Sequence, residues 1–502
     1  MAIIAGIYAD KSRPALREIL TRMLHCQRHR DDSDPIMLID ERMAIGMANK
    51  HDAIFCNNEE QYVHTHEYSP QNGIYGFIDG IVLESPHLQK KLKSQGVSVR
   101  WPVCSSIISA AYERWSLDFM SHLEGEFACA LWIPNEKKVI LARDPYGHKP
   151  LHYYWNGKSF IFSSEIKGIL AAGVPREIDL VNFSDFLTLN CIPYPGTIFK
   201  NIFQVPPGSM VIFHDGRIAE KEYWQIKLCE DASVSLNEAA FQLEEAIREA
   251  VRKRIVTDKI YCFLSGGIDS SAIISVASEI SDQSVHAISV GFEEEDDELE
   301  DAAIMAHHVG ARHHKIIATP GSFFDMLETL VFHHDSPFTD TSAYPTYFAG
   351  KLVRELTDVI LTGDGPDQMM AGSEHHIFAV QHNSFAPRRK MYQVLSKWGS
   401  NLLQRVVKSP APNLLSKAYR RLYRESISPV HAVFDLRSYF PDLVKKFICS
   451  EEIWLIHMNN SPHRHPESWF NEAGDVDDIN KYLYADMKFY LPDDLMICLM
   501  IL

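Results

Sequence analysis

The sequence lacks the features that mark secreted, membrane-spanning and nucleic-acid-binding proteins. Its nine cysteines are dispersed over 502 residues without a Cys-x-x-Cys pair, which argues against a disulfide framework or a zinc ribbon and favours a reducing, cytoplasmic setting. No run of about 18 apolar residues occurs, so we expect no membrane span. Asp10 and Lys11 interrupt the apolar start of the chain, so we expect no signal peptide. With 49 basic and 66 acidic side chains, the net charge of −17 argues against nonspecific nucleic-acid binding.

The sequence also lacks a Walker-type phosphate loop, Gly-x-x-x-x-Gly-Lys-Ser/Thr. It has instead Ser-Gly-Gly-Ile-Asp-Ser-Ser at 265–271, between an apolar, β-prone segment at 260–264 and a helix-like segment at 272–277. A strand that ends in two glycines and leads into a helix presents free backbone amides at the positive end of the helix. This pattern predicts a cradle for phosphate or pyrophosphate. The residues of the predicted cradle are Ser265, Gly266, Gly267, Asp269, Ser270 and Ser271.

Asp269 is the unusual member of this loop, because its carboxylate would repel phosphate oxygens unless a cation lay between them. Mg²⁺ is the ion that best explains a carboxylate at this position. The alternative is an ordinary strand-to-helix turn with capping serines. The strand, the loop and the helix together favour the phosphate site.

A second loop, at 361–368, follows another apolar segment and reads Leu-Thr-Gly-Asp-Gly-Pro-Asp-Gln. If both segments are neighbouring parallel strands, Asp364 and Asp367 lie at the same sheet edge as Asp269. Carboxylates gathered around phosphate suit Mg²⁺ coordination, and one of them can instead orient a nucleophile. The alternative is a tight acidic turn that caps a helix.

Two patterns of secondary structure divide the chain. Short apolar segments between turns make residues 1–224 β-rich, which predicts layered sheets with flanking helices, and a polar linker follows at 230–235. From 236 onward, strands alternate with helices, which predicts a parallel, doubly wound α/β sheet in residues 236–502. The predicted strands are 3–7, 76–78, 127–132, 139–142, 151–154, 160–163 and 210–213 in the first part, and 260–264, 286–290, 314–317 and 358–361 in the second. The predicted helices include 14–24, 105–115 and 236–254.

Other charged and histidine-rich segments carry less information. The acidic run at 293–301 is interpreted as a solvated loop and a helix start rather than a metal site. The adjacent histidines that begin at 307, 313 and 333 show no zinc-ligand spacing.

Taken in order, several motifs resemble the asparagine synthetase family over nearly the whole chain. They are EGEFACALW at 124–132, ARDPYGHKPLHYY at 142–154, FSSEIKGIL at 162–170, SGGIDSS at 265–271, VGFEEEDDELEDAA at 290–303, DTSAYPTYFAGKL at 340–352, LTGDGPDQMMAG at 361–372 and DMKFYLPDDL at 486–495. The resemblance implies an N-terminal domain like Ntn-hydrolases and class II glutamine amidotransferases, followed by an ATP-pyrophosphatase domain.

For the second domain the resemblance implies chemistry with ATP and Mg²⁺. A carboxylate attacks the α-phosphate of ATP to give an acyl-adenylate and pyrophosphate, and an amine then forms the amide and releases AMP. Asp269 and Asp367 match the family's metal-binding aspartates, and Asp364 matches an acidic residue near the acyl centre. Leu264, Val290 and Gly363 match positions that contact the nucleotide.

The first domain departs from the family at its glutaminase residues. Ala2 occupies the position of the nucleophilic cysteine, and Asp79-Gly80 replaces the Asn-Gly step that holds the oxyanion. Residues 103–106 lack both acids of the step that binds the amino group of glutamine. We therefore predict no glutamine hydrolysis. Neither Cys26 nor Cys104 has the terminal amine that would let it substitute.

Such a chain needs another source of amine. Two branches of the family, the β-lactam synthetases and the lasso-peptide macrolactam synthetases, resemble this chain in lacking glutaminase activity. The basic segment at 387–424 favours the lasso-peptide branch, with a precursor peptide as substrate. That segment would hold the peptide or a precursor-processing protease, or it is a helical cover with a solvated basic face. The alternatives are an asparagine synthetase that uses free ammonia on a small amino acid, and a non-catalytic ATP-binding homologue.

The end of the chain bears on activity. The family continues after 495 into a helix with a phosphate-contacting lysine, whereas this sequence reads Met-Ile-Cys-Leu-Met-Ile-Leu to residue 502. The sequence is therefore interpreted as truncated there.

Overall fold

The computed structural model describes residues 2–49, 73–83, 104–231, 233–255, 257, 259–291, 297–317, 323–357, 359–383, 421, 423–440 and 442–496. The tail at 497–502, residue 103 and most of the basic segment at 387–424 lie outside the described residues.

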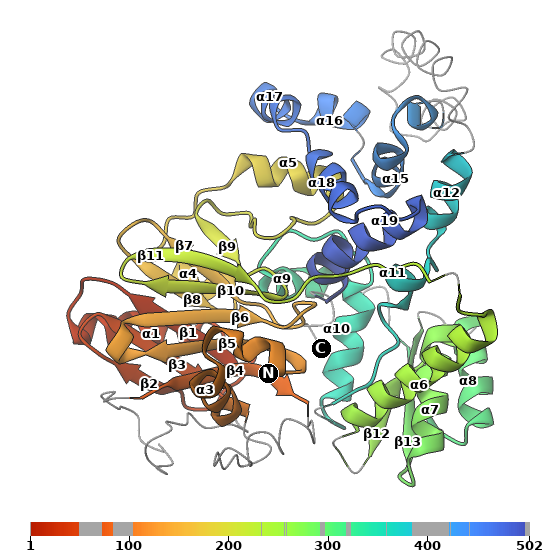
Figure 1. Ribbon diagram of the computed structural model, residues 1–502, viewed down its shortest axis with the longest axis horizontal. Helices are drawn as coiled ribbons and strands as arrows, with labels where there is room; N and C mark the ends of the chain where they lie inside the picture. Colours follow the sequence, from red (N-terminus) through yellow and green to blue (C-terminus); the bar gives the residue numbers. More distant parts are fainter. Residues whose placement is uncertain are drawn as a thin grey trace.

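The N-terminal domain consists of two antiparallel sheets packed face to face, on the left of Figure 1. The first sheet has the order β2-β3-β1-β8-β7-β9, and the second has the order β11-β10-β6-β5-β4. The strands are β1 (Ile3–Tyr8), β2 (Ile36–Ile39), β3 (Met43–Ala48), β4 (Tyr75–Val82), β5 (Gly125–Ile133), β6 (Lys138–Arg143), β7 (His152–Trp155), β8 (Phe160–Ser163), β9 (Ile202–Gln204), β10 (Ser209–His214) and β11 (Arg217–Glu222).

Alternation of side chains along the strands explains these layers. One face of each sheet contributes large apolar residues, such as Phe77, Phe160 and Phe213, to a shared core between the sheets. Helices α1 (Arg13–His25) and α4 (Ile166–Ala171) cover the outer face of the first sheet. Helix α3 (Cys104–Trp115) covers the outer face of the second. The domain is therefore a helix–sheet–sheet–helix sandwich, as the β-rich pattern predicted.

The C-terminal domain contains a parallel sheet of β12 (Ile260–Phe263), β13 (Val285–Gly291) and β14 (Arg312–Ile317). Helix α6 (Leu236–Arg254) packs with α7 (Ile268–Ile280) beside this sheet, at the lower right of Figure 1. The parallel sheet with crossover helices confirms the predicted α/β class.

The predicted strand at 358–361 is wrong in extent. In the described part of this segment only Leu361 joins the sheet, through a parallel bridge to Cys262. Thr357 explains the difference, because its hydroxyl donates to the carbonyl of Val359 (2.9 Å) and accepts from the amide of Val359 (3.1 Å). These local bonds compete with pairing along a strand.

The remaining helices surround the sheet and extend above the N-terminal domain (Figure 1). They are α5 (Leu180–Leu189), α8 (Asp297–His308), α9 (Phe323–His334), α10 (Ala343–Val353), α11 (Pro366–Met370), α12 (Glu374–Asn383), α15 (Pro429–Arg437), α16 (Asp442–Ile448), α17 (Glu451–Asn459), α18 (Arg464–Glu472), α19 (Asp478–Ala485) and the π-helical segment η5 (Asp486–Leu495). The helix start predicted within the acidic run is confirmed, since α8 begins at Asp297.

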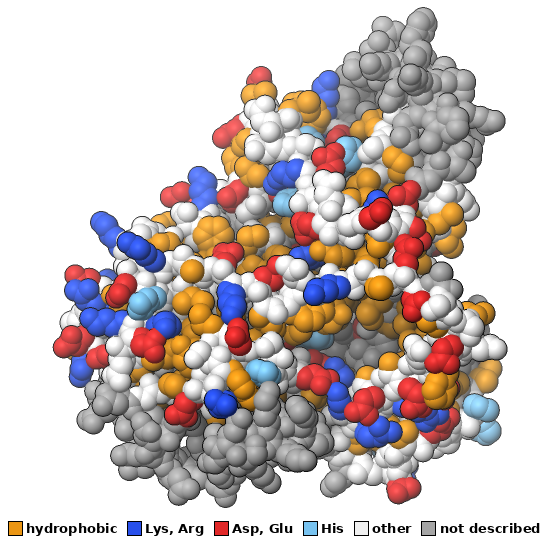
Figure 2. Space-filling view, viewed as in Figure 1, with side chains coloured by type: hydrophobic (Ala, Val, Ile, Leu, Met, Phe, Trp, Pro, Cys, Tyr) orange, Lys and Arg blue, Asp and Glu red, His pale blue; other side chains and the backbone are white. Residues whose placement is uncertain are grey.

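On the face drawn in Figure 2, acidic and basic side chains are interspersed, and neither sign forms a continuous area. None of the described helices is long and apolar enough to cross a bilayer.

Candidate active site

The loop at 265–271 joins β12 to α7 in a conformation that requires glycine. Gly266 has a φ of +83°, and a Cβ there would lie 2.7 Å from the Cβ of Asp301 on α8. Ser270 Oγ accepts a hydrogen bond from the amide of Ser265 (3.2 Å) and lies 3.0 Å from Ser265 Oγ. The amide of Gly267 donates to Ser265 Oγ at 3.3 Å. The loop thus folds over the start of α7, where the first amides of a helix have no partner within the helix.

The second loop lies directly against the first. The amide of Leu361 donates to the carbonyl of Tyr261 (2.8 Å), and the amide of Phe263 donates to the carbonyl of Leu361 (2.9 Å). A Cβ on Gly363 would lie 2.7 Å from the amide nitrogen of Ser270. The two loops therefore approach closely only because residue 363 has no side chain.

Three aspartates converge where the loops meet. Burial raises the pKa of Asp269, and the negative charges of Asp367 and Asp364 raise it further. Burial also raises the pKa of Asp364, with a further contribution from the charge of Asp340. Asp367 lies on α11, where Gly372 leaves room for its carboxylate, since a Cβ on that glycine would lie 2.1 Å from Asp367 Oδ1. Mutual repulsion among carboxylates on adjoining loops fits a site that holds a divalent cation.

Leu264 and Val290 lie beside these loops. The amide of Leu264 donates to the carbonyl of Ile288 (2.9 Å), and the Leu264 carbonyl accepts from Ser289 Oγ (2.6 Å). Val290 is half-buried near the carboxyl end of β13. Ser271 occupies the first turn of α7. The structure therefore brings all of the site residues named from the sequence to one sheet edge.

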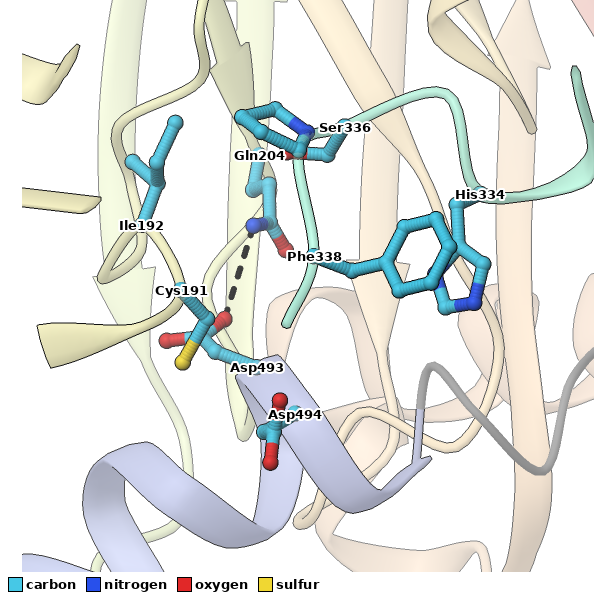
Figure 3. Close-up of a pocket in the computed structure, with 9 residues that line it drawn as sticks. Cys191, Ile192, Gln204, His334, Ser336, Phe338, Asp493 and Asp494 are labelled. Atoms are coloured by element: carbon cyan, nitrogen blue, oxygen red, sulfur yellow. Dashed lines mark hydrogen bonds between the residues drawn. The ribbon is translucent and has the colours of Figure 1, made fainter. Parts of the chain in front are cut away.

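A small pocket with both polar and apolar walls lies between the domains (Figure 3). It is lined by Cys191, Ile192, Gln204, His334, Ser336, Pro337, Phe338, Asp493 and Asp494. Burial raises the pKa of Asp493 and of Asp494 to about 7. Asp493 accepts hydrogen bonds from the amide of Tyr194 (3.0 Å) and from Gln204 Nε2 (3.4 Å). Asp340 influences the pKa of both Asp494 and Asp364, so acidic groups extend from the loops to this pocket.

At the start of the N-terminal domain, buried ionic groups occupy the place of the expected glutaminase residues. The amide of Ala2 donates to Asp79 Oδ1 (2.9 Å), and Arg30 forms an ion pair with the other oxygen of Asp79. Arg30 Nε also donates to the carbonyl of Ala2 (3.1 Å), and Arg30 NH1 lies 3.4 Å from Glu165 Oε1. Asp79 is therefore neutralised by a fixed cation, which the sequence did not predict, because Arg30 is 49 positions away.

Cys26 offers no replacement nucleophile. Burial raises the pKa of its thiol to about 11, so the thiol stays protonated at neutral pH. The side chain of Cys104 lies outside the described residues.

Sequence reasoning missed three further groups. Asp493 and Asp494 had a usable signal, because two adjacent acids follow an aromatic and apolar stretch. Arg30 and the pair His375-His376 had none, because their partners are distant in the sequence.

Fold and site together define a two-domain protein, with a layered β domain followed by an α/β domain that has a glycine-containing loop and clustered aspartates at its strand ends. The chain belongs to the asparagine synthase family. Residues 242–498 match the family described as Asparagine synthase, and residues 1–224 match that described as Glutamine amidotransferase domain. The fold is therefore Ntn-type and glutamine amidotransferase-like in the first domain and ATP-pyrophosphatase-like in the second.

Individual relatives are distant. The chain is 28% identical over 430 residues to Asparagine synthetase (glutamine-hydrolyzing) 1 of Bacillus subtilis. These residues cover 84% of this chain and 64% of the relative. It is 30% identical over 307 residues to Putative asparagine synthetase (glutamine-hydrolyzing) 2 of Methanocaldococcus jannaschii, covering 59% and 58%. It is 28% identical over 327 residues to Amidase chyE of Penicillium rubens, covering 61% and 48%. The chain thus spans less than two thirds of the length of these relatives.

Proposed function

We propose that this protein is an ATP-dependent ligase that forms an amide, releases AMP and pyrophosphate, and does not hydrolyse glutamine. The observation that carries the proposal is the contact between the 265–271 loop and Gly363, which gathers Asp269, Asp364 and Asp367 at one sheet edge. Family membership supports the same class of reaction.

The loop residues have separable roles in this proposal. The amides at the start of α7, with the hydroxyls of Ser265 and Ser270, bind the pyrophosphate leaving group, while Leu264, Val290 and Gly363 contact the nucleotide. Asp269 and Asp367 would hold Mg²⁺, which when bound neutralises phosphate charge. Asp364 accepts the proton of the attacking amine, and its raised pKa makes it a stronger base.

The absence of glutaminase activity is supported by two features of the N-terminal domain. Ala2 supplies no thiolate, so the nucleophile of the relatives is missing. The Asp79 carboxylate and the Arg30 guanidinium saturate one another in the interior, so neither is free to hold glutamine or an oxyanion.

We propose that the amine belongs to the substrate itself, as in lasso-peptide macrolactam synthetases. The enzyme would adenylate an Asp or Glu side chain of a precursor peptide and present that acyl group to the peptide's own N-terminal amine. The acidic groups from Asp364 to Asp494 would attract the cationic amine toward the acyl centre. A precursor-processing protease would be the natural partner.

The names of the relatives favour a second candidate, an asparagine synthetase that uses free ammonia. Here the acyl group would be that of aspartate, and ammonia would replace the peptide amine. The loops at 265–271 and 361–368 would bind ATP and Mg²⁺ in the same way for either substrate.

Exchange of labelled pyrophosphate into ATP separates these candidates. Three mixtures are compared, containing a linear peptide with a free N-terminus and one internal Asp or Glu, aspartate with ammonium, or neither. Exchange with the peptide, and a peptide product lighter by one water, are the expected results. Exchange with aspartate and ammonium, but not with the peptide, would favour the second candidate. Tight Mg-ATP binding without exchange in any mixture would indicate a non-catalytic homologue and refute both.

A further inference from the structure

Two histidines and one aspartate form a buried cluster behind the second loop. His375 and His376 lie in the first turn of helix α12, and Asp486 begins η5. One ligand atom from each lies within 4.8 Å of the others. His375 Nε2 is 2.7 Å from Asp486 Oδ2, and His376 Nε2 is 3.1 Å from the same oxygen. One nitrogen of each ring therefore lies close to the same carboxylate oxygen.

The cluster leaves one imidazole unsatisfied. His376 is 1% exposed, yet within the described residues neither Nδ1 nor Nε2 forms a hydrogen bond. Its Nε2 approaches Asp486 in distance but not in hydrogen-bond direction. Buried side-chain nitrogens of native proteins nearly always have a partner, so a buried imidazole without a hydrogen bond, beside a carboxylate and a second imidazole, fits a cation-binding site.

Arg437 holds the carboxylate in the orientation that a metal ion would need. Its NH1 donates to Asp486 Oδ1 (2.6 Å), and its guanidinium lies 4.0 Å from the centroid of the Tyr490 ring. Oδ2 is therefore turned toward the two histidines. Metal-binding carboxylates are commonly fixed in this way by a hydrogen bond to the other oxygen.

We propose that His375 Nε2, His376 Nε2 and Asp486 Oδ2 bind one Zn²⁺ ion, separate from the Mg²⁺ site at the sheet edge. Two imidazoles and a carboxylate suit zinc, whereas magnesium prefers oxygen ligands alone. Tetrahedral zinc with bonds of about 2.0–2.1 Å places its ligands about 3.3 Å apart. The two nitrogen-to-oxygen separations, 2.7 and 3.1 Å, are shorter than this by a few tenths of an ångström, and all the ligand atoms lie within 4.8 Å of one another.

The location suggests what this ion does. Helix α12 follows α11, which carries Asp367, and the connection includes Gly372 against the Asp367 carboxylate. An ion bound by both α12 and η5 would fix the position of α12 and, through α11, that of the second loop. The three residues touch no proposed substrate group, so they are positioning residues, and the zinc site is independent of the proposed function.

The test uses the untagged full chain, stripped with a chelator and titrated with Zn²⁺ against a chromophoric chelator. His375→Gln removes the least buried ligand. The matched control is the double variant His307→Gln/His308→Gln, which alters an exposed adjacent pair on α8. The wild type and the control should bind one equivalent of Zn²⁺, and H375Q should bind it at least about 100-fold more weakly.

X-ray absorption of the zinc-loaded wild type provides a measurement that depends on no variant. Nitrogen and oxygen ligands at about 2.0–2.1 Å with the signature of two imidazoles are expected. Sulfur ligands at about 2.3 Å, no stoichiometric binding by the wild type, or equal affinity in H375Q would each overturn the proposal.

Discussion

The two domains use buried and clustered carboxylates in opposite ways. In the N-terminal domain, Asp79 is fully buried and is matched by the Arg30 guanidinium and the Ala2 amide. At the C-terminal sheet edge, Asp269, Asp364 and Asp367 gather without an ion pair to any described lysine or arginine. Burial raises the pKa of Asp269, and the charges of Asp367 and Asp364 raise it further. A carboxylate neutralised by a fixed cation is part of the structure. Carboxylates left to repel one another are positioned for a cationic ligand.

The strongest test of this comparison removes the fixed cation. Arg30→Leu leaves the Asp79 charge buried and unpaired, so we expect a loss of about 3–5 kcal/mol in the free energy of unfolding, measured with urea. The double variant Arg30→Leu/Asp79→Leu should recover much of that loss. Arg28→Leu, at an exposed position on the same segment, should change stability by less than about 0.5 kcal/mol. Equal stability of wild type and Arg30→Leu would contradict the structural role of the pair.

A substitution in the aspartate cluster of the C-terminal sheet edge should reduce catalytic activity and leave the stability of the fold unchanged. Asp269→Asn removes a proposed cation ligand, so pyrophosphate exchange should fall by about 10³-fold while the unfolding free energy stays close to that of the wild type. Asp282→Asn, an exposed position just beyond α7, is the matched control. Retained exchange in Asp269→Asn would show that the aspartates are not the cation site.

Asp364 is expected to act in amide formation but not in adenylation, so its substitution separates the two steps of the proposed reaction. Asp364→Asn cannot accept a proton, so amide formation should fall by about 10²-fold, whereas pyrophosphate exchange should change by only a few fold. The two rates are followed in parallel by product mass and by label exchange. A parallel loss of both rates would place Asp364 in adenylation instead.

The pocket between the domains adds a smaller effect that depends on pH. Burial raises the folded-state pKa of Asp493 to about 7, so this group favours folding at low pH and its contribution is lost as pH rises through 7. The wild type should therefore lose about 2 kcal/mol relative to Asp493→Asn between pH 5 and pH 7, measured by urea unfolding. The exposed variant Asp475→Asn should follow the wild type. Identical pH profiles for wild type and Asp493→Asn would refute the assignment.

Local patterns in the sequence predicted helices and strands correctly where neighbouring residues determine the structure. The long amphipathic helix at 236–254 matches α6 in both bounds, and the strand at 160–163 matches β8. The two loops could be placed together because each follows an apolar strand-like segment of one parallel sheet. Strand β11 was missed because it is an edge strand with the sequence RIAEKE, which gives little hydrophobic signal.

Contacts between distant residues could not be predicted from those patterns. The ion pair of Arg30 with Asp79 and the cluster of His375, His376 and Asp486 each join segments far apart in the chain. No periodicity encodes such pairs, because they depend on how whole layers pack. The sequence predicted that the Asp79 carboxylate is unsuited to hold an oxyanion, but it could not predict the pairing of Asp79 with Arg30.

We propose that the α/β domain forms an amide while the N-terminal domain does not hydrolyse glutamine. Incubation of the full chain with Mg-ATP, the peptide substrate and glutamine labelled with ¹⁵N at its amide tests both halves in one mass-spectrometric measurement. We expect AMP and an unlabelled peptide product lighter by one water, with no glutamate formed. Labelled product together with glutamate would contradict it.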